Sequence, residues 1–168
     1  MERRGKNNMI RVLFVCLGNI CRSPMAEALF RDLVKKEGLA DIIKIDSAGT
    51  GDWHIGNPPH QGTREILKKY QISDEGLKAR KMTSADLNFD YIIGMDSENI
   101  KNIKKLGTLP SNAKVKRLLD FVEDKQEMDV PDPYYSGNFE EVYELVKEGT
   151  ENLLMEIKKD LQAKGVIE

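Results

Sequence analysis

Strand-like and helix-like runs alternate along this chain of 168 residues, and this alternation most restricts the folds open to it. Short apolar runs rich in β-branched residues predict buried strands at residues 9–15, 42–46, 89–95 and 114–122. Runs with apolar residues at helical spacing lie between and after them. Such alternation is typical of a parallel sheet with helices on both faces. We therefore predict an α/β fold with a three-layer, doubly wound sheet.

Capping and turn residues predict where the helices begin and end. Ser23 is the expected N-cap of the first helix, Pro24 its first residue and Gly38 its end. Further helices are expected after the proline pair 58–59, after a capping box at 83–86, at 97–106 and after Asn138. The polar segment 124–138 is expected to be a loop.

Composition excludes several classes of protein. The net charge of -2 gives no bulk attraction to nucleic acid or to anionic membranes, and no apolar run is long enough to cross a bilayer. We expect a cytoplasmic monomer with no nucleic-acid or membrane partner. Residues 9–168 are expected to form a single domain, and residues 1–8 a flexible extension. The only two cysteines cannot form a disulfide framework for this length.

Both cysteines lie in one turn, CLGNICRS, at the carboxyl end of the first expected strand. Gly18 and Asn19 tolerate the left-handed backbone that curls a chain into a nest of amide groups. The helix that follows adds partial positive charge. Arg22 adds a planar fork of donors that matches two phosphate oxygens. The turn is therefore a candidate cradle for a tetrahedral anion.

Cys16 lies at the base of this cradle, where positive surroundings favour a thiolate that can attack phosphorus. Ser23 can donate a hydrogen bond to the sulfur. Alternatively, Cys16 is a small buried hydrophobe, since a bare C-x5-R occurs by chance. The preceding strand and the following Ser-Pro helix start favour catalysis. Cys21 is either inert or forms a reversible disulfide with Cys16, and both interpretations stay open.

Asp132 is the candidate proton donor for the leaving group. It lies in VPDPYYSGN between two prolines, which present its carboxylate on a stiff loop, and a bound dianion would keep it protonated. His54 and His60 are the alternative donors. Loop aromatics more often serve recognition than packing. Trp53, Tyr134 and Tyr135 would together line a slot for a flat ring.

The stretches VLFVCLGNICRSPMAEA and DPYY, with IDSAGTGDW and FDYIIGMD between them, closely resemble the low-molecular-weight protein tyrosine phosphatases. The likeness covers nearly the whole chain from Met9. It implies a flavodoxin-like, four-stranded parallel sheet in the order 2-1-3-4, with no metal or cofactor. It also implies a phosphotyrosine protein or a small aryl phosphate as substrate and inorganic phosphate as product.

The resemblance assigns roles to individual residues. Cys16 would become a phosphocysteine, Arg22 would clamp the phosphate oxygens, and Asp132 would act first as acid and then as base. The phosphate-binding residues would be Leu17, Gly18, Asn19, Ile20, Cys21, Arg22 and Ser23. Ser47 would support Asn19, which holds the loop, and Ser23 would bond the thiolate. The substrate pocket would comprise Leu17, Ile20, Trp53, Tyr134 and Tyr135.

One departure and three rival functions accompany the resemblance. Many animal members carry a histidine that supports the loop asparagine where this chain has Leu77, so part of that network must be replaced or lost.

Arsenate reduction needs further cysteines outside the loop, which are absent. Phosphoarginine phosphatases carry threonine at the position of Ile20 and lack the double tyrosine. A silent anion-binding module would need neither Cys16 nor Asp132.

Overall fold

A parallel four-stranded sheet in the order β2-β1-β3-β4 forms the centre of the computed structural model, which describes residues 9–168. The strands are β1 (Ile10–Cys16), β2 (Ile43–Gly49), β3 (Tyr91–Gly94) and β4 (Lys114–Arg117). The predicted fold class and strand order are confirmed. The expected extension at residues 1–8 lies outside the described residues.

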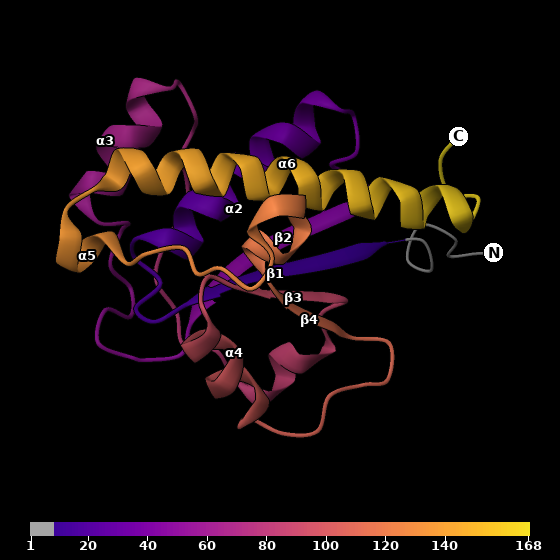
Figure 1. Ribbon diagram of the computed structural model, residues 1–168, viewed down its shortest axis with the longest axis horizontal. Helices are drawn as coiled ribbons and strands as arrows, with labels where there is room; N and C mark the ends of the chain where they lie inside the picture. The colour runs from indigo at the N-terminus through magenta and orange to yellow at the C-terminus, as the bar shows by residue number, and fades with distance from the viewer. Residues whose placement is uncertain (1–8) are drawn as a thin grey trace.

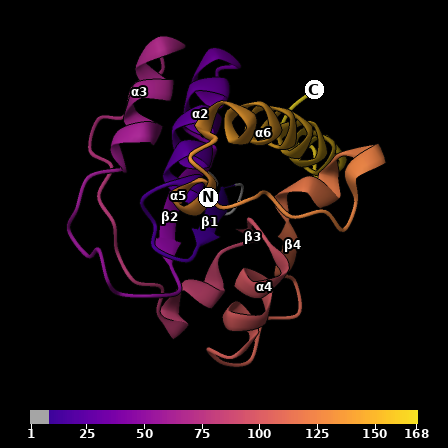
Figure 2. The same cartoon turned by 60° about the vertical axis from the view of Figure 1, so that its left-hand side comes forward.

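Helices cover both faces of the sheet (Figures 1 and 2). One face carries α2 (Arg22–Lys36), α3 (Gln61–Lys69) and α6 (Phe139–Ala163), and the other carries α4 (Ser97–Lys104) and the 3₁₀ helix η1 (Ser84–Asn88). Val12 and Phe14 of β1 point into the core under α2 and α6, while Leu13 and Val15 point into the opposite core. This double burial explains why the first strand is continuously apolar.

The start of α2 differs from the prediction. Cys21 is its N-cap and makes no side-chain capping bond, so Ser23 is the second helical residue and not the cap. The Ser23 hydroxyl is engaged by Cys16 and Asn19 instead of by a helix amide. The helix ends at Lys36 with Glu37 as its C-cap, and Gly38 follows with φ +73°, as expected for a glycine stop.

The boundaries of four other elements also differ from the prediction. The helix α3 begins at Gln61 and not at the proline pair, because His60 Nδ1 accepts from the Gly62 amide as N-cap. The strand β2 continues to Gly49, since small residues after Asp46 still pair with β1. Both β3 and α4 are shorter than predicted, and the expected capping box at 83–86 starts η1.

The fourth strand is the largest error of the sequence prediction. It ends at Arg117, because Asp120 accepts from the Arg117 amide and turns the chain into the 3₁₀ helices η2 (Leu118–Phe121) and η3 (Glu123–Lys125). The segment predicted as a loop also contains a short helix, α5 (Pro133–Ser136). The prediction that Asn138 caps the last helix is confirmed, since its Oδ1 accepts from the Glu141 amide.

Among residues 9–168, no helix is both long and apolar enough to cross a membrane.

Gly149 of α6 allows the helix to approach η2 closely. A Cβ at this position would lie 2.5 Å from Leu118 Cγ, and Leu118 is fully buried. Gly149→Ala should therefore lower the free energy of unfolding by about 1–2 kcal/mol, because overpacking outweighs the gain in helix propensity. Thermal unfolding measures the effect, with the exposed Glu144→Ala as a control on the same helix. A midpoint equal to that of the parent would contradict the close approach.

Candidate active site

The loop at residues 16–23 connects β1 to α2 at the carboxyl edge of the sheet. The carbonyl oxygens of residues 16, 17, 20 and 21 accept hydrogen bonds from Thr50, Gly51, His60 and Thr63, which lie outside the loop, at 2.7–3.1 Å. In a trans peptide the N–H of the next residue points the opposite way from the carbonyl. The loop therefore turns several amide hydrogens toward its own concave side, which is the predicted anion cradle.

Asn19 holds this loop in shape. Its φ of +57° places it in the left-handed region, as predicted. Its Nδ2 donates to Ser23 Oγ at 2.8 Å and to Ser47 Oγ at 2.9 Å, and its Oδ1 accepts from the Arg80 amide at 3.0 Å. These bonds use both amide hydrogens and one oxygen lone pair of a buried side chain.

Gly18 does not share the left-handed backbone, contrary to the prediction. A Cβ there would lie 3.1 Å from His54 Cδ2, so its small size gives room to the His54 ring.

Asn19 is held in place by further residues that the sequence analysis missed. The Ser47 hydroxyl, which accepts from Asn19, donates to Glu27 Oε1 at 2.5 Å. Burial raises the pKa of Glu27. Leu77, at the position of the family histidine, is buried in the core, and the Arg80 amide supplies a donor to Asn19. A signal for Glu27 was its place one helical turn after Ser23.

Ser23 orients a hydrogen toward the candidate nucleophile. Its Oγ lies 3.0 Å from Cys16 Sγ and 2.8 Å from Asn19 Nδ2. The amide nitrogen Nδ2 of Asn19 can only donate, so Ser23 Oγ accepts this hydrogen bond. The hydroxyl hydrogen of Ser23 therefore remains for the Cys16 sulfur. A hydrogen bond donated to sulfur favours the thiolate.

Arg22 is buried and shares its donors among three acceptors. Its Nη1 donates to Asp96 Oδ2 at 2.6 Å and to the Val130 carbonyl at 3.0 Å, while its Nη2 donates to Asp132 Oδ2 at 3.4 Å. Its Nε has no partner among residues 9–168. Of five N–H donors, Nε and one hydrogen of Nη2 remain. This edge of the guanidinium suits two oxygens of one phosphate.

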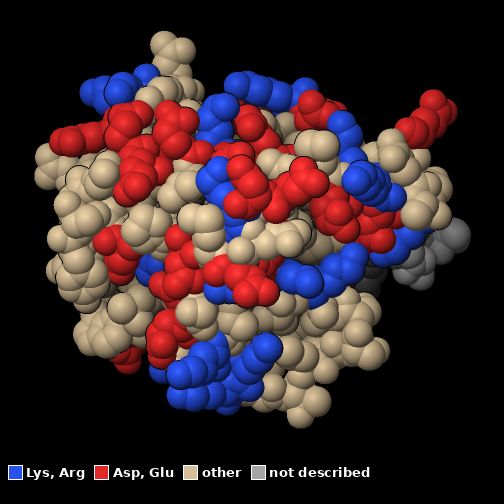
Figure 3. Space-filling model, viewed as in Figure 1, with Lys and Arg blue, Asp and Glu red and all other residues tan. Residues whose placement is uncertain are grey.

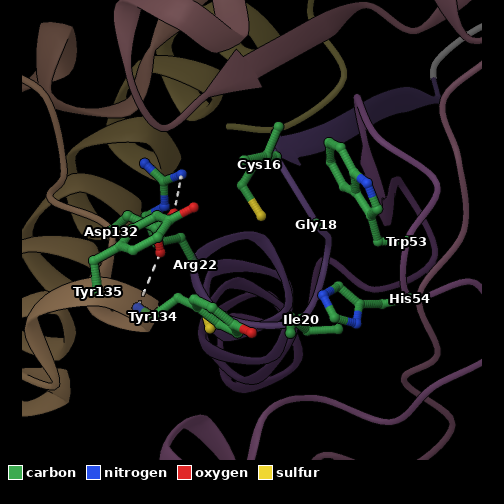
Figure 4. A pocket seen from close by; sticks show the side chains of 11 residues that line it. Cys16, Gly18, Ile20, Arg22, Trp53, His54, Asp132, Tyr134 and Tyr135 are labelled. Atoms are coloured by element: carbon green, nitrogen blue, oxygen red, sulfur yellow. Dashed lines mark hydrogen bonds and ion pairs between the residues drawn. The ribbon is translucent and has the colours of Figure 1, made fainter.

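Asp96 and Asp132 converge on Arg22 from separate parts of the chain. Asp96 follows β3 and caps α4, with Oδ1 accepting from the Asn99 amide at 2.8 Å. The sequence analysis gave it no role, although its place after a parallel strand was a usable signal. Asp132 caps α5, and its Oδ1 accepts from the Tyr134 amide at 3.0 Å. Figure 4 shows the Asp132 carboxylate and Arg22 on one side of the Cys16 sulfur.

A cavity of about 370 Å³ opens above Cys16. Leu17, Ile20, Trp53, Tyr134 and Tyr135 line it, as expected, together with Gly18, Cys21 and His54. His54 was considered only as a proton donor. Trp53 is 67% exposed and Tyr135 78% exposed, so both lie at the rim. Asn19, Ser23 and Ser47 are buried and do not line the cavity.

Charge around the molecule is mixed. On the face that carries α6, acidic and basic side chains are interspersed (Figure 3). Arg22 is the one cation lining the cavity among the described residues, so attraction for an anion is local. Over residues 9–168, no group of three or more His, Cys, Asp or Glu side chains is arranged to hold a metal ion.

Cys21 has a different environment from Cys16. Burial raises the pKa of its thiol from the ordinary 9.0 to about 12, and the neighbouring Cys16 and Asp132 add to the shift. Cys21 is therefore a neutral thiol at neutral pH. Both cysteines are free.

This shift predicts a loss of stability in alkali. Between pH 9 and 12 the unfolded thiol is ionised while the folded thiol keeps its proton, so stability falls as pH rises. The parent should lose up to ~1.4 kcal/mol per pH unit more than Cys21→Ser in this window. Denaturant unfolding at pH 8, 9 and 10.5 under reducing conditions measures the difference. Parallel curves for the two proteins would contradict a buried neutral thiol.

Comparisons with known proteins show which family the chain resembles over most of its length. The family model described as low molecular weight phosphotyrosine protein phosphatase matches residues 11–163. The low molecular weight protein-tyrosine-phosphatase YfkJ of Bacillus subtilis is 60% identical over 155 residues, covering 92% of this chain and 99% of YfkJ. PtpA of Staphylococcus epidermidis, with the same description, is 48% identical, covering 93% and 99%.

Solved structures resemble the chain closely. The crystal structure of Bacillus subtilis YfkJ superposes with a TM-score of 0.87, covering 90% of this chain and 96% of that one. A drosophila arginine phosphatase is 34% identical, with a TM-score of 0.79 and coverage of 89% and 98%.

Proposed function

The chain belongs to the low-molecular-weight phosphotyrosine protein phosphatases, and we propose that it hydrolyses phosphotyrosine and other aryl phosphate monoesters through a phosphocysteine at Cys16. One observation carries the proposal: Cys16, Arg22 and Asp132 line the same cavity, where Arg22 Nε has no partner among the described residues and Asp132 accepts from Arg22 Nη2.

In the first step the Cys16 thiolate attacks phosphorus in line with the departing phenol. The loop amides and the free Nε and Nη2 hydrogens of Arg22 hold the nonbridging oxygens, where charge develops. Protonated Asp132 gives its proton to the phenolic oxygen as the P–O bond breaks. The Ser23 hydroxyl stabilises the thiolate before attack.

In the second step Asp132, now a carboxylate, takes a proton from a water molecule that attacks the phosphocysteine. The P–S bond breaks, inorganic phosphate leaves, and the sulfur returns as a thiolate that accepts from Ser23. The same carboxyl group is therefore acid and base in turn.

The shape of the cavity supports a flat aryl substrate. Trp53, Tyr134 and Tyr135 border it, and aromatic side chains contact a phenyl ring well. The similarity to an arginine phosphatase makes phosphoarginine the second candidate. Ile20, Tyr134 and Tyr135 are bulky side chains that line the cavity, and their bulk favours a phenol over a guanidinium. Arsenate reduction and a silent anion-binding module remain less favoured, for the reasons drawn from the sequence.

We also propose that a peroxide can oxidise Cys16 to a sulfenic acid, whose sulfur the Cys21 thiolate attacks with release of hydroxide to form a disulfide, since both cysteines line the same cavity. The raised pKa of Cys21 makes this reaction slow at neutral pH, because the thiolate is the attacking species. A thiol nucleophile needs reducing surroundings, which supports a location in the cytoplasm.

Two substitutions test the chemistry. Cys16→Ser should abolish hydrolysis of p-nitrophenyl phosphate while inorganic phosphate still binds, measured by calorimetry. Asp132→Asn should lower kcat/KM by roughly 10²–10⁴, more for phenyl phosphate than for p-nitrophenyl phosphate, whose leaving group needs less protonation. Asp129→Asn, in the same segment, is the matched control and should stay near the parent. Unchanged hydrolysis by Cys16→Ser would end the proposal.

Substrate class is tested with matched peptides. Phosphotyrosine should be hydrolysed with a higher kcat/KM than phosphoarginine, and phosphoserine should be the poorest substrate. Ile20→Thr should narrow the ratio of phosphotyrosine to phosphoarginine by about tenfold, because one pocket side chain is worth ~1–3 kcal/mol. A parent that prefers phosphoarginine would support the second candidate function instead.

A further inference from the structure

His60 contacts three parts of the site. Its backbone amide donates to the Ile20 carbonyl of the 16–23 loop at 2.7 Å, and its Nδ1 caps α3. Its ring stacks on Phe139 at the start of α6, with centroids 5.1 Å apart and planes at 22°. The same ring meets Tyr134 of α5 edge-on, with centroids 5.8 Å apart. His60 therefore joins the 16–23 loop to α5 and to the start of α6.

The backbone of Tyr134 contacts the candidate acid. The Tyr134 amide donates to Asp132 Oδ1 at 3.0 Å, and α5 begins directly after Asp132. The Tyr134 ring is 53% exposed, and besides His60 it lies near His54 and Tyr135, with centroids 6.3 and 5.4 Å away. A shift of Tyr134 would therefore carry the Asp132 carboxylate with it, relative to the cavity in Figure 4.

The stacking is separate from the capping. Asn, Asp, Ser and Thr are the favoured N-cap residues, so capping alone does not explain a histidine here. The cap uses Nδ1, whereas the ring contacts use the face and edge of the imidazole. Gly62 supports the stack, since a Cβ there would lie 2.4 Å from the Phe139 ring. Glycine at this position leaves the space that Phe139 occupies beside His60.

We propose that His60 is a positioning residue for proton transfer: its ring holds Tyr134 and Phe139 so that Asp132 lies over the phosphate that binds in the 16–23 loop. The inference rests on the proposed function, because it requires Asp132 to be the general acid. His60 itself does not line the cavity and exchanges no proton with substrate.

Two variants separate the functions of the ring and the cap. His60→Asn keeps a capping oxygen for the Gly62 amide and removes the ring. His60→Phe keeps a ring for Tyr134 and Phe139 and removes the cap. We expect His60→Asn to unfold near the parent midpoint but to lose kcat/KM about tenfold for phenyl phosphate and much less for p-nitrophenyl phosphate. His60→Phe should unfold earlier and keep the parent ratio between the two substrates.

The decisive measurement is the ratio of kcat/KM for phenyl phosphate to kcat/KM for p-nitrophenyl phosphate, because a general loss of stability lowers both values alike. In an Asp132→Asn background, His60→Asn should leave the ratio unchanged, since the acid is already gone. Inorganic phosphate should inhibit the parent and His60→Asn equally. If His60→Asn had the same ratio of kcat/KM for the two substrates as the parent, this inference would be wrong, while the proposed function would still stand. An Asp132→Asn variant with the same ratio as the parent would instead contradict the proposed function, because loss of the acid must slow phenyl phosphate more than p-nitrophenyl phosphate.

Discussion

The buried side-chain amide of Asn19 is the interaction on which the site depends. It joins α2 through Ser23, β2 through Ser47 and the segment beside β2 through the Arg80 amide. A buried amide left without partners costs ~1–3 kcal/mol, so the three bonds and the left-handed backbone stabilise one another. Because Asn19 fills the acceptor site of Ser23, it also directs the serine hydrogen to Cys16. One side chain therefore both holds the loop in shape and orients the hydroxyl beside the sulfur.

Arg22 is the centre of a second network, defined by charge. One buried guanidinium faces two carboxylates, those of Asp96 and Asp132, before any substrate arrives. A phosphate dianion on its free edge would add negative charge to this group. In the proposed first step Asp132 carries a proton, which would offset that charge. The proposed substrate and the proposed acid therefore share one cation, Arg22.

The sheet brings these two networks together at one edge. The 16–23 loop follows β1, Ser47 lies near the end of β2, and Asp96 follows β3, so all three lie at the carboxyl ends of their strands. The helices that follow β1 and β3 lie on opposite faces of the sheet. The Val130 amide donates to the Met95 carbonyl, which holds the Asp132 segment at the same edge.

The sequence by itself determined the features that are local along the chain: the first strand, the turn with Cys16 and Arg22, the left-handed Asn19 and the cap at Asn138. The strand order came from the family resemblance and not from periodicity. Only the tertiary structure assigned Glu27, Arg80 and Asp96 to the site and ended β4 at Arg117. It also showed that His60, considered from the sequence as a proton donor, stacks on Phe139 and does not line the cavity. These residues act through partners that are distant in sequence or through a single carboxylate, so the chain could mark a position, as for Glu27 and Asp96, but not the side chain that it meets.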